Sequence, residues 1–170
     1  MPGDVRILGT GQLLDLQRKL RSAGHENLRS SMQRRIRRAA EPLRDDLQDS
    51  IRHLAITSAG RKAGKRGGPS PTTRPLRATI AESVRISVRT TGDPGAKVWV
   101  DRGRLPHDIT NGLIKQLDDG RVRHPVFGNR KRWAQQNANP GWWTKTVRQH
   151  TPRMEREVAR VLDDVKRRIE

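Results

Sequence analysis

The feature that most limits the possible folds is one apolar stripe between residues 28 and 54. Its members recur every three or four residues, which places them on one face of a helix. They are Leu28, Met32, Ile36, Ala39, Leu43, Leu47, Ile51 and Leu54. The pattern predicts a helix over about 26–56, roughly 45 Å long, with Pro42 expected to kink it or divide it in two. A long helix with a single apolar face must pack on another part of the protein.

A second amphipathic helix is predicted at the C-terminal end, over 151–170. Thr151 suits the N-cap position and Pro152 suits the first turn. The apolar stripe of this helix consists of Met154, Val158, Val161, Leu162, Val165 and Ile169. We expect the stripe to dock on a small sheet or on the long N-terminal helix. Nearer the start of the chain, the leucines of 13–20 predict a further helix, and the glycines and proline of 1–11 predict an irregular arm.

Residues 84–100 alternate apolar with polar side chains, which predicts a half-exposed β-hairpin. The apolar positions are Val84, Ile86, Val88, Ala96, Val98 and Val100. Between them, 91–95 (Thr-Gly-Asp-Pro-Gly) is a strong turn sequence. Trp99 falls on the face opposite the apolar positions, so we expect it to cover something other than the main core.

The region that follows the hairpin predicts shorter elements. Residues 109–117 have helical spacing, and Asp118, Asp119 and Gly120 are expected to end that helix. Val122 and the pair 126–127 predict a short strand, which the turn residues 128–129 would end.

These elements predict an α+β fold in one domain. Long N-terminal helices and a C-terminal amphipathic helix would pack on a small antiparallel β-sheet. Within 1–170 we expect an arm at 1–11, a helical part at 12–57 and a mobile basic loop at 58–75. A hairpin, a helix and short strands would follow at 76–150, and the C-terminal helix at 151–170. Only 32% of the residues are hydrophobic, which favours surfaces that neighbouring subunits complete over a fully buried core.

The net charge of +18 is concentrated in two segments. Residues 58–77 contain six Lys or Arg and no acid, and residues 121–153 contain eight and no acid. Patches of one sign predict an anionic partner or an acidic protein surface. The loop at 58–75, with Arg61, Lys62, Lys65 and Arg66 as its basic contact residues, is either a solvated linker or a finger that orders on DNA or on an acidic surface.

Nothing in the sequence indicates catalysis or a cofactor. The chain has no cysteine, its five histidines are dispersed, and no phosphate-binding loop motif is present. Asp45, Asp46 and Asp49 lie together on the long helix and in principle suit a metal ion. Arg44 and Arg52 flank them, however, so we expect a solvated, ion-paired helix face. No run of apolar residues is long enough for a membrane span. We therefore expect a protein that is not an enzyme and needs no metal, cofactor or membrane.

Aromatic residues cluster in one part of the chain. There are only five, and Phe127, Trp133, Trp142 and Trp143 all fall within 127–143. Large aromatic side chains bury the most apolar area, so we expect these four, and Trp99, to act as packing or interface anchors.

This segment also resembles a known family. Its order is 123–129 (Arg-His-Pro-Val-Phe-Gly-Asn), then Trp133, then 140–143 (Pro-Gly-Trp-Trp), then a terminal amphipathic helix. Over roughly 105–170 it resembles the tail-completion or neck (head–tail joining) proteins of long-tailed bacteriophages, of the lambdoid gpZ type. The resemblance implies a structural virion protein of the neck or tail, made in the cytoplasm of the bacterial host. The basic loop at 58–75 and the high charge match no pattern of that family.

As partners, the resemblance implies copies of the chain itself, forming a six-fold ring. The ring would lie between head-closure or adaptor proteins and the tail-terminator protein, with genomic DNA passing through its channel. The alternative is a non-specific nucleic-acid-binding protein that uses the basic segments 58–77 and 121–153. No helix-turn-helix, zinc-finger or RNA-binding strand motif supports base-specific reading.

Overall fold

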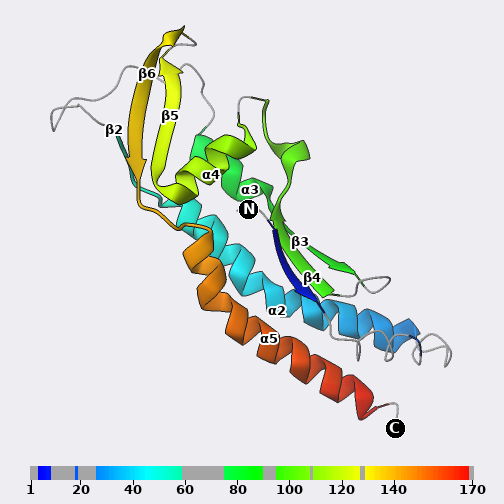
Figure 1. Ribbon diagram of the computed structural model, residues 1–170. Coiled ribbons are helices and arrows are strands. Elements are labelled where there is room, and N and C mark those ends of the chain that lie inside the picture. The colour runs from blue at the N-terminus through cyan, green and yellow to red at the C-terminus, as the bar shows by residue number, and fades with distance from the viewer. Residues whose placement is uncertain are drawn as a thin grey trace.

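The computed structural model describes residues 4–8, 18, 26–58, 75–89, 95–107, 109–126 and 129–168. Its helices are α2 (Glu26–Arg52), α3 (Leu76–Ser83), α4 (Asn111–Asp119) and α5 (Thr144–Lys166), with a short 3-10 helix, η1 (Arg102–Arg104). Its strands are β1 (Asp4–Leu8), β2 (Ile56–Ser58), β3 (Val84–Arg89), β4 (Gly95–Val100), β5 (Arg121–Val126) and β6 (Asn129–Ala138). Figure 1 shows helices packed with small antiparallel sheets, so the predicted α+β class is confirmed.

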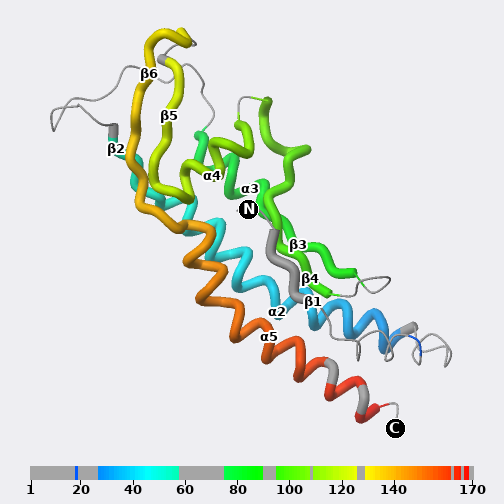
Figure 2. Tube along the Cα trace, viewed as in Figure 1, coloured from blue at the N-terminus to red at the C-terminus, as the bar shows by residue number. Residues whose placement is uncertain are grey.

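Helix α2 is the centre of the body. It contacts α5 on one side and strands β3 and β4 on the other, and α3 packs near its end. Figure 2 shows α2 and α5 running side by side in opposite directions. Most of the apolar stripe predicted for α2 is buried in this arrangement, from Met32 through Leu43 to Leu54, whereas Leu28 and Ala39 are partly buried and Ala40 is buried next to Ala39. The stripe of α5 faces it, with Met154, Val158, Val161 and Val165 also buried.

Helix α2 continues through Pro42 without being divided, so of the two effects expected of Pro42, division is wrong and a kink stays a prediction. The helix ends at Arg52, before the predicted limit of 56. Residues 56–58 form strand β2 instead, because Ile56 and its two neighbours pair with β6, 80 residues away in the sequence. Helical spacing cannot report such a long-range strand pairing.

The first sheet, which we call sheet A, has the strand order β1-β4-β3. The predicted hairpin is confirmed, since β3 and β4 are antiparallel with Val84 opposite Val100 and Ile86 opposite Val98. Strand β1 was not predicted. The irregular arm expected at 1–11 is wrong over 4–8, where Val5 pairs with Val98 along the free edge of β4. The helix expected around residues 13–20 lies outside the described residues, apart from residue 18.

The second sheet, sheet B, has the strand order β2-β6-β5. Strands β5 and β6 form a long hairpin that extends away from the helices (Figure 1). We call this hairpin the arm. Strand β5 corresponds to the short strand predicted around residue 122, but β6 was not predicted. Its outer half is exposed on both faces, and its half-buried positions include the polar Gln136, so its sequence does not alternate apolar with polar residues.

Helix α5 begins seven residues before the predicted start, at Thr144 and not at Thr151. Thr151 is not an N-cap, since its hydroxyl donates to the carbonyl of Val147 at 2.8 Å inside the helix. Pro152 also lies within the helix. The cap comes from another element. The Asp118 carboxylate, at the end of α4, accepts hydrogen bonds from the backbone N–H groups of Trp143 at 2.8 Å and Thr144 at 3.2 Å.

Candidate functional site: a basic hairpin arm

The arm is fixed to the body at its base by the end of α4. Gly120 ends α4 in the left-handed conformation, with φ of 82°, and its carbonyl accepts a hydrogen bond from the Ala138 N–H at 2.9 Å. A side chain at Gly120 would place a Cβ 2.9 Å from the Ala138 carbonyl oxygen, so the close approach requires glycine. On the other strand, the Gly141 N–H donates to the Asp118 carbonyl at 2.7 Å. Both strands therefore leave the body from one rigid point.

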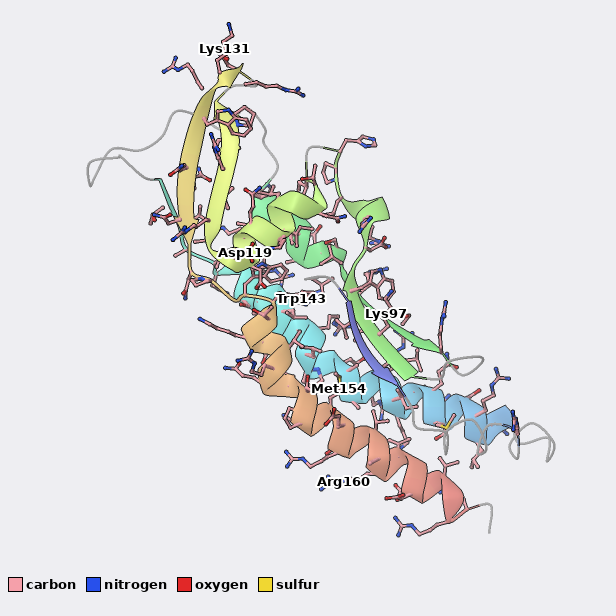
Figure 3. All side chains as sticks on the ribbon, viewed as in Figure 1. Lys97, Asp119, Lys131, Trp143, Met154 and Arg160 are labelled. Atoms are coloured by element: carbon pink, nitrogen blue, oxygen red, sulfur yellow. The ribbon has the colours of Figure 1, made fainter. Side chains whose placement is uncertain are left out.

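Only the base of the arm is packed against the core. Val122 is buried, with 4% of its surface exposed, and Ala138 is partly buried beside it. Beyond this point the side chains of β6 from 129 to 133 are all exposed. Figure 3 shows Lys131 at the far end of the arm and Trp143 at its base. An exposed two-stranded hairpin gains little stability from its own contacts, so the arm is a surface feature and not part of the core.

The register of the arm defines two faces. Arg121 lies opposite Asn137, Arg123 opposite Gln135, and Pro125 opposite Trp133. Because side chains alternate between faces along a strand, these three pairs share one face, which we call the arginine face. The other face carries Val122 at the base and then His124 opposite Ala134. The arginine face is exposed along almost its whole length, whereas the Val122 face turns toward the body at its base.

The arm carries positive charge without compensation. Its basic residues are Arg121, Arg123, Arg130, Lys131 and Arg132, all of them exposed, and 121–138 contain no Asp or Glu. Within the described part of the chain none of these five residues forms an ion pair. The other basic residues of the predicted segment 121–153 lie on α5, which shows that the segment is divided between two elements. The basic contact loop with Arg61, Lys62, Lys65 and Arg66 lies outside the described residues.

Trp133 is on the arm and not in the core. Its side chain is 46% exposed, the indole N–H donates to the Arg130 carbonyl at 2.8 Å, and the Arg123 guanidinium stacks over the ring at 4.8 Å from its centroid. Of the two roles expected for Trp133, that of a packing anchor in the core is therefore wrong, and that of an interface anchor stays a prediction. The reason is that β6 leaves the body at Ala138, so the residues beyond it have no core to pack on.

The other aromatic residues lie elsewhere. Trp142 and Trp143 are buried, each 3% exposed, and meet edge to face with ring centroids 5.6 Å apart. They form the packing at the start of α5. Trp99 is half-buried on the outer face of sheet A, where the Lys97 ammonium lies 5.6 Å from its ring centroid. Phe127 lies outside the described residues. The aromatic cluster of the sequence is thus separated into a core pair, an arm residue and a sheet residue.

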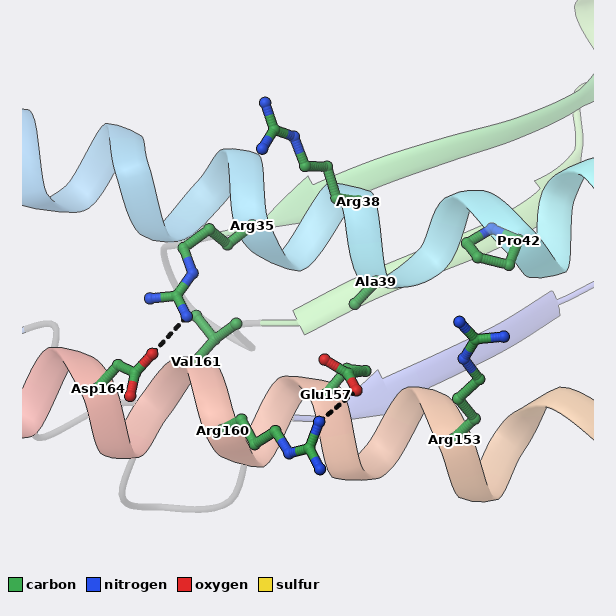
Figure 4. A pocket seen from close by; sticks show the side chains of 9 residues that line it. All are labelled: Arg35, Arg38, Ala39, Pro42, Arg153, Glu157, Arg160, Val161 and Asp164. Carbon is green, nitrogen blue, oxygen red and sulfur yellow. Dashed lines mark hydrogen bonds and ion pairs between the residues drawn. The ribbon is translucent and has the colours of Figure 1, made fainter.

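A groove of about 360 Å³ lies between α2 and α5 (Figure 4). Four arginines and two acids line it, together with an apolar floor of Ala39, Pro42 and Val161. Both acids are engaged, since Arg35 donates to Asp164 at 2.5 Å and Arg160 donates to Glu157 at 2.9 Å. The hydrogen bond from Arg35 lowers the pKa of the Asp164 carboxyl below its ordinary value. Figure 4 shows Arg38 extending away from α5. The groove has the chemistry of a helix–helix seam.

Three aspartates on α2 are also paired. Asp45 meets Arg44 at 2.6 Å, Asp49 meets Arg52 at 3.2 Å, and Asp46 meets the His150 ring of α5 at 2.6 Å. This is the ion-paired helix face that the sequence predicts.

Among the described residues no group of three His, Asp or Glu side chains is arranged to hold a metal ion. No described helix is both long and apolar enough to cross a membrane.

Sequence reasoning missed two parts of this site, the strand β6 and the role of Asp118. A weak signal for the second exists, because Gly120, two residues after Asp118, and Gly141, directly after Pro140, mark the points where the arm joins the body. Comparisons with protein-family models, with curated proteins and with solved structures found no match for this chain.

Proposed function

We propose that this chain is a non-enzymatic structural subunit of a tailed-bacteriophage neck, in which the basic arm contacts an anionic partner, either an adjoining component or the DNA that passes through the channel. The observation that carries the proposal is the arm itself. Its residues 121–138 include no acid, its outer part at 129–133 is exposed on both faces, and backbone hydrogen bonds hold it where it leaves the body. A protein gains nothing for its own stability from such an element, so its use lies in contact with a partner.

The segment that resembles the neck family supports this placement. Of its 123–129 part, 123–126 form the outer half of β5 and residue 129 begins β6, and its 140–143 part forms the joint between the arm and α5. The two parts are separate in sequence but belong to one structural unit, an arm and its fixed base. Trp142 and Trp143 pack that base into the core, and Asp118 joins it to α4.

The proposed assembly is a homo-oligomeric ring, six-fold, between head-closure or adaptor proteins and the tail terminator. A ring needs heterologous contacts that close by rotation, and exposed elements that project from a rigid body suit such contacts. The fraction of hydrophobic residues, 32%, is also low for a protein that buries all its surfaces within one copy.

The first test is location. Mass spectrometry of purified virions is expected to find this protein in low copy number beside neck and tail proteins. Its absence from mature particles would contradict the proposal. Electron microscopy and mass measurement of the purified protein, alone and with neck components, would give the ring order.

The second test measures how well variants of this protein support the joining of heads to tails. R130Q/K131Q/R132Q removes three charges from the end of the arm and is expected to reduce the yield of joined particles at least ten-fold. The matched control is R148Q/R156Q/R168Q, which removes three charges from exposed positions at the α5 end of the chain. An equal effect of both variants would show that total charge matters and the arm does not.

A further inference from the structure

The residues on the arginine face of the arm indicate which kind of partner it can bind. Beginning at the base, it presents Thr57, Asn137 and Arg121 in one row, then Gln135 and Arg123, then Trp133 and Pro125. Side chains on one face of a strand repeat at about 6.8 Å, so the two arginines are spaced along β5 at a distance close to that of successive phosphates in an extended nucleic-acid strand. Each polar side chain in these rows carries at least one hydrogen-bond donor.

From these features we propose that the arginine face binds the phosphodiester backbone of nucleic acid. The inference rests on the proposed function only in taking the arm as the contact element. Guanidinium groups bind phosphate oxygens through paired donors, and the amides of Gln135 and Asn137 add neutral donors beside them. The face holds no carboxylate that would repel phosphate.

An acidic protein surface fits this face less well. The centres of protein interfaces are depleted in charge and rich in apolar and aromatic contacts, whereas protein–nucleic acid interfaces are polar and strongly cationic. Along the arginine face, Trp133 is the one large apolar side chain, and it is half exposed. The face therefore has the donors for a phosphate backbone but little apolar area for a protein partner to cover.

Trp133 favours single-stranded over double-stranded nucleic acid. The Arg123 guanidinium covers one side of the indole, and the hydrogen bond to the Arg130 carbonyl fixes the ring. The exposed part of a ring held in this way is a platform on which an unpaired base can stack, which adds to binding of single strands. Bases in a duplex are not available for stacking, so a duplex would be held by phosphate contacts alone.

The test uses the purified full chain and two fluorescently labelled probes, a 30-nucleotide oligothymidine and a 30-base-pair duplex, in a salt series. R121Q/R123Q is expected to weaken binding of both probes at least ten-fold. It is also expected to reduce the slope of log K against log salt by about 1.8 for the duplex and about 1.4 for the single strand, because two phosphate contacts are lost. The matched control is R85Q/R89Q, which removes two exposed arginines from one face of strand β3 and is expected to leave both slopes unchanged.

A second variant tests the stacking platform. Trp133→Ala is expected to weaken oligothymidine binding about ten-fold and to change duplex binding less than two-fold. Equal losses on both probes would contradict the stacking role. Circular dichroism confirms that each variant is folded.

Two results overturn the inference as a whole. One is wild-type protein that binds neither probe at 100 mM salt, or that binds polyglutamate more tightly than both. The other is an equal effect of R121Q/R123Q and R85Q/R89Q. These outcomes are separate from the virion tests, since the neck proposal stands or falls by the presence of the protein in particles and by head–tail joining.

Discussion

The carboxylate of Asp118 is the residue whose removal best tests how the arm and α5 are held together. It lies at the end of α4, is 6% exposed, and accepts hydrogen bonds from the first N–H groups of α5 at 2.8 and 3.2 Å. Trp143, at the N-cap position of α5, makes no capping hydrogen bond with its side chain. Asp118→Ala would therefore leave two N–H groups at a helix N-terminus without their acceptor, one of them buried.

The expected cost follows from these contacts. A hydrogen bond to a charged group contributes about 1.5–3 kcal/mol, and loss of an N-cap costs about 0.5–2 kcal/mol. Since both donors share one carboxylate oxygen, the two contributions overlap. We expect Asp118→Ala to lower the free energy of unfolding by about 2–4 kcal/mol. For a chain of 170 residues this corresponds to a fall in Tm of roughly 5–15 °C. Asp118→Asn keeps an oxygen acceptor and loses the charge at the helix dipole, so its cost is expected near 1 kcal/mol.

The neighbouring residue provides the control. The Asp119 side chain is 51% exposed and pairs with Lys115 one helical turn earlier, and such surface pairs contribute about 0–1 kcal/mol. Urea unfolding followed by far-ultraviolet circular dichroism measures all three variants. Asp118→Ala and Asp119→Ala differing by less than about 0.5 kcal/mol would refute the reasoning, because the capping bonds would then contribute nothing beyond a surface contact.

Three further predictions test burial and charge. Trp142→Ala is expected to lower the free energy of unfolding by about 3–5 kcal/mol because the ring is 3% exposed. Trp133→Ala, at a position 46% exposed, is expected to lower it by less than about 1 kcal/mol. Similar melting curves for the two variants would contradict the packing described. Val161→Asp places a carboxylate in the seam between α2 and α5, where Val161 is 5% exposed, and is expected to abolish folding; a soluble protein with native circular dichroism would show that the seam is not buried. Arg35→Gln is expected to raise the pKa of Asp164 toward its ordinary value of 3.8, as measured by NMR titration. Because the folded-state pKa of Asp164 is depressed, its contribution to stability is present above pH 3.8 and is lost as the pH falls through the folded-state value. A stability difference between Arg35→Gln and wild type that does not shrink as the pH falls through the folded-state pKa measured by the titration would contradict this assignment.

The sequence alone determined those helices and strands in which buried residues recur at regular spacing. The stripes of α2 and α5 recur at helical spacing, and the apolar residues of β3 and β4 alternate, because in each case one face is in the core and the other is not. A half-buried element records its own geometry in the order of its residues. The α+β class and the hairpin of sheet A followed from these patterns.

The tertiary structure decided the elements that depend on distant partners. Strands β1 and β2 form because β4 and β6 offer free edges, and neither segment has a sufficient pattern of its own. The outer half of strand β6, 129–133, is exposed on both faces. Its inner half alternates between half-buried and exposed positions, but one of the half-buried residues is the polar Gln136, so the sequence shows no clear apolar alternation. The start of α5 depends on Asp118, a residue 25 positions away, and local capping rules therefore placed it seven residues too late.

The candidate site shows the same division. The sequence indicated that the aromatic and basic residues of 121–153 matter together, because composition is visible without a fold. Only the structure separated them, with Trp142 and Trp143 in the core and Trp133 on the arm beside Arg123. The physical reason is that charge and residue type are properties of the chain, whereas exposure depends on where the body ends, and that point is set by the contacts of Gly120 and Ala138 at the base of the arm.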